Sequence, residues 1–205
     1  MDKFKTDQEN FWATEFGSQY IGRNESPELF AANINFFSNI VSKMTDSCSS
    51  VLELGANIGM NVGPISQLLP GVEFTAVEIN PEACEQLKLT GCNVIHGSIL
   101  DFVSDDRFDL TFTKGVLIHI NPDQLHHVYR ALYENSKRYV LVAEYYNPTP
   151  VSVNYRGHED RLFKRDFAGE MLEKYRDLTL VDYGFAYHKG KFPQDDITWF
   201  LMEKK

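Results

Sequence analysis

The stretch with the clearest chemical meaning is an apolar run that passes directly into glycines. Residues 51–61 read VLELGANIGMN. Because glycine has no Cβ and adopts positive φ at little cost, Gly55 and Gly59 allow the backbone to approach a ligand closely. Glu53 is a carboxylate inside an otherwise apolar strand, where burial without a partner is costly. We predict that this stretch binds a cofactor through Glu53, Gly55, Asn57, Gly59 and Asn61.

A second acidic residue follows at a spacing that is typical of nucleoside sites. Glu78 ends the apolar run FTAVE, roughly 20 residues after the glycines, and a carboxylate at that place accepts hydrogen bonds from ribose hydroxyls. The next apolar run ends in Gly-Ser-Ile, where a polar side chain meets an adenine amino group and an apolar one packs on the ring. The predicted nucleoside contacts are Glu78, Ile79, Ser98 and Ile99.

The glycine pattern argues against a nicotinamide dinucleotide. The dinucleotide motif GxGxxG needs its second and third glycines for the pyrophosphate and for helix packing. Asn57 and Met60 stand at those two positions. A ligand without a pyrophosphate makes weaker demands on the turn, so an NAD-dependent oxidoreductase is the weaker alternative.

The elements that must position these residues alternate along the chain. From Ser50 onward, short β-branched runs alternate with longer segments of helical period, which predicts an α/β fold, Rossmann-like, with a seven-stranded, mostly parallel sheet flanked by helices. Helices are expected over 60–69, 81–89, 122–135 and 165–175. An N-terminal helical cap is expected over 1–49, ahead of a core over 50–205. The expected strands are 51–54, 72–77, 93–96, 108–113, 139–144, 178–183 and 197–202.

Composition narrows the class of protein. A chain of 205 residues fits one domain, which we place over 1–205. The formal net charge of −9 argues against a broad nucleic-acid surface and favours small-molecule substrates. Three cysteines without CxxC spacing indicate neither a metal site nor a disulfide framework. With no signal peptide or long apolar run, we expect a cytoplasmic protein that does not enter membranes.

In their order and spacing, these elements resemble the class I methyltransferases that use S-adenosyl-L-methionine (SAM). The resemblance covers about residues 50–145: the glycine turn, the acid ending the second strand, the polar residue after the third, and FDLTFTKGVLIHI from Phe108. It implies SAM as cofactor, with Lys114 and Gly115 in a loop beside it. Two positions depart from the family pattern: Asn57, where glycine is frequent, and Ser98, where aspartate is common.

A narrower resemblance appears near the two ends of the chain. FWATEFGSQYIGRN at residues 11–24, EYYNPTPV at 144–151, YRGH at 155–158 and LFKRDF at 162–167 are similar to the methylases associated with pseudaminic acid biosynthesis. This likeness implies a nonulosonic sugar, or its nucleotide derivative, as the acidic acceptor.

The remaining candidates concern the acceptor and the closing of the site. His119 is our first candidate for the base that removes the acceptor proton, because histidine titrates near neutrality, and His158 is the second. Tyr20 and Arg23 are predicted cofactor contacts, with Arg23 pairing the methionyl carboxylate. They follow Trp12 and Phe16 in an aromatic cluster that can close over the cofactor. A local excess of basic residues after the fifth strand suits an acidic ligand. The predicted substrate contacts are Tyr145, Asn147, Tyr155 and Arg156.

Two further hypotheses stay open at this point. The same fold can host SAM chemistry without intermolecular methyl transfer, such as an intramolecular cyclisation. It can also serve as a SAM-binding module without catalysis, which predicts binding without turnover and indifference to changes at His119 and Arg156.

Overall fold

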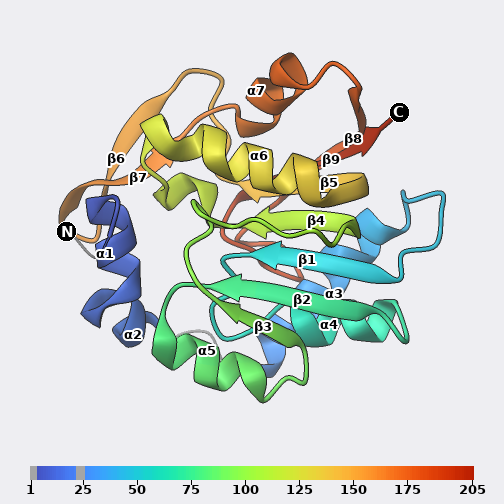
Figure 1. The fold of residues 1–205 in the computed structure, drawn as a ribbon, viewed down its shortest axis with the longest axis horizontal. Helices are drawn as coiled ribbons and strands as arrows, with labels where there is room; N and C mark the ends of the chain where they lie inside the picture. The colour runs from blue at the N-terminus through green and yellow to red at the C-terminus, as the bar shows by residue number, and fades with distance from the viewer. Residues whose placement is uncertain (1–3, 22–25) are drawn as a thin grey trace.

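The computed structural model describes residues 4–21 and 26–205, apart from the side chains of Glu15 and Tyr20. Its centre is a seven-stranded sheet in the order β3-β2-β1-β4-β5-β9-β8, with helices on both faces (Figure 1). The strands of this sheet are β1 (Ser50–Leu54), β2 (Glu73–Glu78), β3 (Asn93–His96), β4 (Phe108–Lys114), β5 (Ser136–Glu144), β8 (Leu178–Ala186) and β9 (Ile197–Lys204). The α-helices are α1 (Asp7–Ala13), α2 (Glu15–Ile21), α3 (Pro27–Val41), α4 (Val62–Leu68), α5 (Pro81–Lys88), α6 (Leu125–Asn135) and α7 (Phe167–Lys174), with short 3-10 turns η1 (Leu117–His119) and η2 (Pro122–Gln124).

The direction of the strands brings one set of loops together. Strands β3, β2, β1, β4 and β5 are parallel, so their carboxyl ends meet at one edge of the sheet. Strand β9 runs antiparallel to both β5 and β8, so the β8–β9 loop returns to that same edge. The predicted α/β class and the mostly parallel sheet are therefore confirmed.

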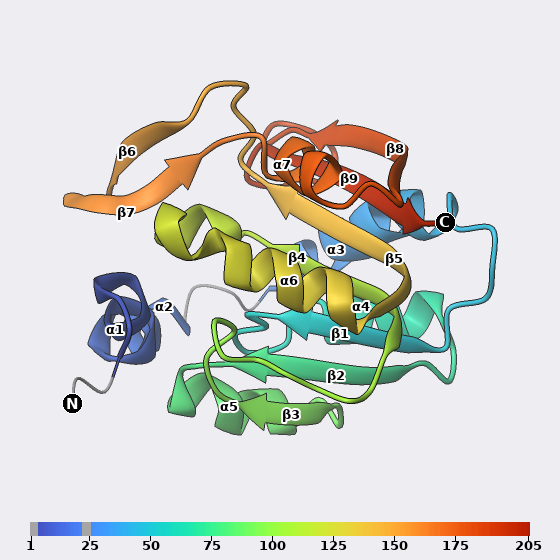
Figure 2. The same cartoon turned by 45° about the horizontal axis from the view of Figure 1, so that its top comes forward.

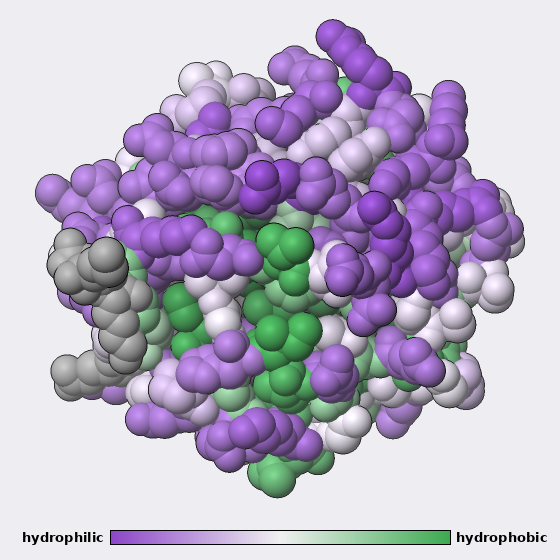
Figure 3. Space-filling model, viewed as in Figure 1, coloured by the Kyte–Doolittle hydropathy of each residue, from purple (hydrophilic) through white to green (hydrophobic). Residues whose placement is uncertain are grey.

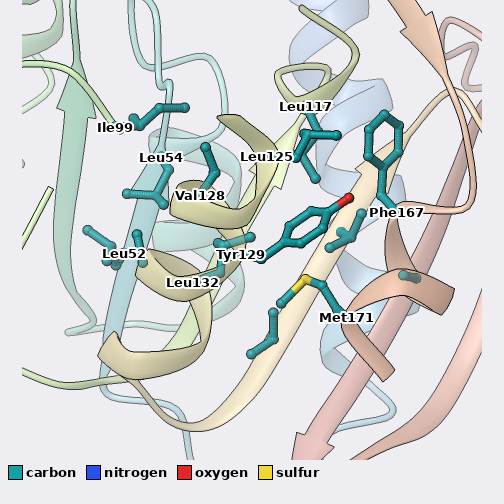
Figure 4. Packing of buried hydrophobic residues seen from close by; sticks show 14 of the residues in the cluster. Leu52, Leu54, Ile99, Leu117, Leu125, Val128, Tyr129, Leu132, Phe167 and Met171 are labelled. Carbon is teal, nitrogen blue, oxygen red and sulfur yellow. The ribbon is translucent and has the colours of Figure 1, made fainter. Parts of the chain in front are cut away.

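Side chains alternate in direction along each strand, so the buried apolar residues form two clusters, one on each face of the sheet. In β1, Leu52 and Leu54 point to the face covered by α6 and α7, whereas Val51 points to the face covered by α3, α4 and α5. Figure 4 shows Leu52 and Leu54 close to Val128 and Leu132 of α6. Helix α6 is amphipathic: it buries Leu125, Val128 and Leu132 against the sheet. Its outer side lies in a part of the surface that is mainly hydrophilic (Figure 3).

The expected N-terminal cap divides into two parts. Helix α3 packs on a face of the sheet beside α4 and buries Phe36, Phe37 and Ile40 in the core. Helices α1 and α2 lie beyond the carboxyl ends of the strands (Figure 1). Asn80 of the loop before α5 joins the two layers, because its Nδ2 donates to the carbonyl of Trp12 at 3.2 Å.

A two-stranded sheet forms in the segment after β5 where an excess of basic residues, but no strand, was predicted. Strands β6 (Val151–Tyr155) and β7 (His158–Lys164) form an antiparallel hairpin that projects beyond α6 (Figure 2). Arg156 and Gly157 form its turn with φ of 53° and 86°, which two-residue turns of the primed type require. The hairpin is mostly exposed, so its strands lack the apolar alternation that marks a half-buried strand.

Two kinds of feature are absent from the part of the chain that the structure describes. No helix there has the length and apolar character to cross a membrane. No group of three or more His, Cys, Asp or Glu side chains in it is arranged to hold a metal ion.

Candidate active site at the carboxyl edge of the sheet

A cavity of about 360 Å³ opens at the carboxyl ends of β1, β2, β3 and β4. In parallel sheets this edge, where loops diverge, is where ligands bind. Helix α1 and the loop between β8 and β9 complete its walls. The sequence-predicted residues that line it are Glu53, Gly55, Asn57, Asn61, Glu78, Ile79, Ser98, Ile99, Lys114, Gly115, His119, Tyr145 and Tyr155.

The glycine turn after β1 is fixed by packing as well as by its backbone conformation. Gly55 has φ of 83°, and a Cβ there would lie 2.8 Å from a methyl of Val116. Gly59 has φ of 87°, and a Cβ there would lie 2.7 Å from a methyl of Leu87. Asn57, with φ of 50°, occupies the left-handed region that asparagine tolerates better than most residues. Gly59 thus allows α5 to pack closely against the turn, and it does not line the cavity.

The carboxylate of Glu78 ties the glycine turn to the end of β2. Its Oε2 accepts the backbone N–H of Asn57 at 2.7 Å, and its Oε1 accepts that of Asn80 at 2.7 Å. Burial raises the pKa of Glu78, and the two backbone N–H groups partly offset that effect. Since a carboxylate oxygen has two lone pairs, each oxygen keeps one acceptor position for a ligand hydroxyl.

Next to this turn lies a group of buried acceptor atoms. Asn61 donates through Nδ2 to Oε1 of Glu53 at 2.6 Å. Oε2 of Glu53 and the side-chain oxygens of Asn57 and Asn61 are buried without a hydrogen-bond partner. Burial raises the pKa of Glu53 to about 8, and burial lowers the pKa of Lys114. Unpaired buried acceptors are costly, so this wall is complementary to a ligand that carries several N–H donors.

His119 lies in the η1 turn, just after β4, and its ring contacts two aromatic rings that also contact each other. Its Nδ1 is 2.6 Å from the carbonyl oxygen of Arg161, and its ring centroid is 4.6 Å from Trp12 and 4.9 Å from Tyr155. Because a carbonyl only accepts, Nδ1 carries the hydrogen and Nε2 carries the lone pair. Burial lowers the pKa of His119 to about 4, so the ring is neutral near pH 7. The expectation that this histidine titrates near neutrality is therefore wrong, and the ring is a weaker base than an exposed histidine.

Glu144 at the end of β5 holds the turn that carries His119, a role that the sequence analysis did not assign. Its Oε1 accepts the backbone N–H groups of Val116 and Leu117, both at 3.0 Å, and its Oε2 accepts that of Ile118 at 3.4 Å. Burial raises its pKa to about 7. Glu144 is the acidic last residue of an apolar strand, and it lies next to the turn that follows β4. An acidic residue at the end of an apolar run is the sequence signal by which this role could have been predicted.

Helix α1 contributes three residues to the cavity, of which only the aromatic Trp12 was expected near the cofactor. Gln8 donates through Nε2 to the carbonyl oxygen of Asp160 in β7 at 3.0 Å. Glu9 accepts a hydrogen bond from the Ser98 hydroxyl. These partners lie 152 and 89 positions away along the chain, so no local pattern reveals them.

The loop between β8 and β9 also reaches the cavity, through Pro193, Gln194 and Asp195. Gln194 is buried and donates through Nε2 to Oδ1 of Asn33 in α3 at 2.9 Å. The negative charge of Asp195 raises the pKa of Lys114, although burial outweighs this effect. The sequence analysis named none of these residues, because the loop carries no motif.

Several predicted residues lie elsewhere. His158 in β7 is exposed and packs on the rings of Phe11 and Phe16, away from the cavity lining. Asn147 is half-buried, does not line the cavity, and donates to the carbonyl of Thr149. Arg156 stacks on the ring of Tyr155 with its guanidinium carbon 5.5 Å from the centroid. The side chain of Tyr20 and the whole of Arg23 lie outside the described residues.

Several solved methyltransferases have a similar fold. The glycopeptide N-methyltransferase MtfA complexed with SAM is 13% identical with a TM-score of 0.64, over 84% of this chain and 94% of its own. The magnesium protoporphyrin IX methyltransferase ChlM from Synechocystis PCC 6803, with bound SAM, is 9% identical with a TM-score of 0.71 over the full length of both chains. The plantazolicin methyltransferase BpumL in complex with SAH is 14% identical with a TM-score of 0.67, over 97% of this chain and 94% of its own.

At these identities the likeness concerns the fold, so the chain has the fold of class I methyltransferases. No protein-family model and no curated protein matches the sequence.

Proposed function

We propose that this protein is a SAM-dependent methyltransferase. The observation that carries the proposal is the wall of unpaired buried acceptors on Glu53, Asn57 and Asn61, adjoining the Glu78 carboxylate in one cavity. SAM carries an ammonium group, two ribose hydroxyls and an adenine ring, which supply the donors that such a wall requires.

The lining residues fit the separate parts of SAM. The second lone pairs of Glu78 are available to the ribose hydroxyls. The acceptors on Glu53 and Asn61 suit the methionyl ammonium. Lys114 is the one lysine or arginine among the described lining residues, and its ammonium suits the methionyl carboxylate. Ile99 provides an apolar surface for the adenine ring.

When bound, SAM would supply an electrophilic methyl group: an acceptor oxygen or nitrogen would bond to the methyl carbon in line as the S–CH3 bond breaks and SAH leaves. The protein's own contribution is to align the acceptor and exclude water. Nε2 of His119 takes the proton that an O–H or N–H acceptor loses, and Glu144 keeps that ring in place through the η1 turn. Trp12 lines the same cavity and offers a π face to the sulfonium.

For the acceptor we propose a small acidic molecule, a nonulosonic sugar or its nucleotide derivative, modified on oxygen or nitrogen. The support comes from the sequence resemblance at the two ends and from cations behind the cavity tyrosines. Arg156 stacks on Tyr155, and Lys164 lies with its Nζ 5.2 Å from the ring centroid of Tyr145. Both tyrosines line the cavity, so a carboxylate beside them meets positive charge.

The test begins with calorimetric titration of the full chain with SAM, S-adenosylhomocysteine (SAH) and NAD, repeated on Glu78→Ala. Glu73→Ala, which removes an exposed carboxylate from the same strand, is the matched control. We expect micromolar binding of SAM and SAH by the wild type and the control, about 100-fold weaker binding by Glu78→Ala, and no heat with NAD. Binding of NAD alone, or of no ligand, contradicts the proposal.

The second stage identifies the reaction. The chain is incubated with methyl-labelled SAM and a panel of acidic nine-carbon sugars, free and nucleotide-linked, with neutral sugars and amines as comparison. Label in an acidic sugar supports the proposed acceptor, whereas label in an amine alone contradicts it. Consumption of SAM without an acceptor favours intramolecular SAM chemistry, and binding without any consumption favours a non-catalytic module.

A further inference from the structure

Helix α1 brings a carboxylate to the part of the cavity beyond the end of β3. Glu9 is only 8% exposed and lines the cavity together with Ser98, Ile99 and Leu100. Its Oε2 accepts the backbone N–H of Lys5 at 2.6 Å, and its Oε1 accepts the hydroxyl hydrogen of Ser98. The carboxylate is therefore held in place from both sides, at the position where the sequence analysis expected an adenine contact from Ser98.

The hydrogen bonds of Ser98 leave its hydroxyl oxygen with a single free lone pair. The hydroxyl donates to Glu9 and accepts the backbone N–H of Leu100 at 3.0 Å. Each of the two oxygens of the Glu9 carboxylate uses one of its two lone pairs on these partners and keeps the other. Glu9 thus has the larger acceptor capacity, and the hydrogen bond from Ser98 orients it.

We propose that Glu9 is the residue that selects adenine, by accepting a hydrogen bond from the exocyclic amino group of the base, and that Ser98 acts as its positioning residue. This inference rests on the proposed use of SAM and names the specificity of that same cavity. An ionised carboxylate only accepts hydrogen bonds. It therefore favours a purine with an amino group at position 6 and disfavours one with a carbonyl oxygen there.

The test compares SAH with S-inosylhomocysteine, in which a carbonyl oxygen replaces the amino group at position 6 and N1 carries a hydrogen, by titration of the full chain. We expect the wild type to bind SAH about 10- to 100-fold more tightly, which corresponds to one hydrogen bond with a charged partner. Glu9→Gln places an amide donor opposite the carbonyl of the inosyl ligand, so the preference disappears or reverses. Glu9→Asp keeps the charge, and we expect it to retain a reduced preference for SAH.

Asp7→Asn is the matched control, because it removes an exposed carboxylate from the same helix. We expect its preference to equal that of the wild type, and a circular dichroism melt checks that each variant is folded. If Glu9→Gln keeps the wild-type preference for SAH, the inference is wrong. It is also wrong if Ser98→Ala abolishes the preference while Glu9→Gln does not, since the hydroxyl then recognises the base. A wild type that binds neither ligand contradicts the proposed function itself.

Discussion

The two sides of the cavity are built in different ways. The wall at the ends of β1, β2 and β5 rests on backbone N–H groups donated to the buried carboxylates of Glu78 and Glu144. The roof, which consists of α1 and the β6–β7 hairpin, rests on side chains: Gln8 bonded to Asp160, and Trp12 against the ring of Tyr155. We expect the wall, in which two buried carboxylates accept several backbone N–H groups, to stay ordered without ligand. We expect the roof, which is held by a side-chain hydrogen bond and by ring contacts, to open at lower free-energy cost, which suits the entry of an acceptor.

The largest effect that we expect lies under the roof, at His119. His119→Gln removes the lone pair that takes the acceptor proton, so kcat with the acceptor found in the labelling screen should fall by about 10²- to 10⁴-fold. The affinity for SAH should stay within about threefold, because the wall is untouched. His126→Gln, an exposed histidine on α6, is the control. An unchanged kcat for His119→Gln would exclude His119 as the base. It would also argue against the view that residues under the roof act on the acceptor while the wall binds the cofactor.

The second effect tests the wall at Glu144. Glu144→Gln replaces a carboxylate that accepts three N–H groups with an amide that accepts fewer and adds an unpaired donor. We expect the free energy of unfolding to fall by about 2 to 4 kcal/mol. Urea denaturation measures this change, and Glu203→Gln, on the neighbouring strand β9, is the comparison. A loss below about 0.5 kcal/mol would mean that the backbone contacts do not order the wall.

The third effect is a pH dependence of cofactor binding through Glu53. With a pKa of about 8, this carboxyl is mostly protonated at pH 6.5 without ligand. An ammonium placed against it favours the ionised form, so binding releases a proton and SAH affinity should rise as pH increases toward 8. The rise is at most tenfold per pH unit. Calorimetry in buffers of different ionisation enthalpy counts the proton, and Glu53→Gln should remove both the proton release and the slope. A pH-independent wild type would show that the ammonium binds elsewhere.

The smallest effect concerns the attachment of the roof. Gln8→Ala removes the hydrogen bond to Asp160, which we expect to stabilise the closed position of α1 by about 1 kcal/mol. Amide hydrogen exchange in residues 7–13 should become about fivefold faster without ligand, and SAH should restore the protection. Asn10→Ala, an exposed position on α1, serves as the control. Equal exchange rates in the wild type and Gln8→Ala would show that the helix is held by its aromatic contacts alone.

The wall could be predicted from the sequence to a large extent, whereas most of the roof could not. The seven strands of the main sheet follow from apolar periodicity, and Glu53 and Glu78 were identifiable because each lies at or near the end of such a strand. The hairpin was missed because its exposed strands carry no apolar alternation. Glu9 and Gln8 were missed because their partners are far away in the chain, and only folding brings them together.

The reversed direction of β9 has a consequence for how this protein could be altered. Because β9 runs against β5 and β8, the segment 187–196 reaches the cavity without belonging to any strand-to-helix turn that forms the nucleoside side. We expect exchanges of sequence at Pro193 and Asp195 to reshape this part of the cavity while leaving the glycine turn and Glu78 in place. The fold thus carries part of the cavity wall on ten consecutive positions outside the strand-to-helix turns, which makes this loop the place to diversify when a different cavity shape is wanted.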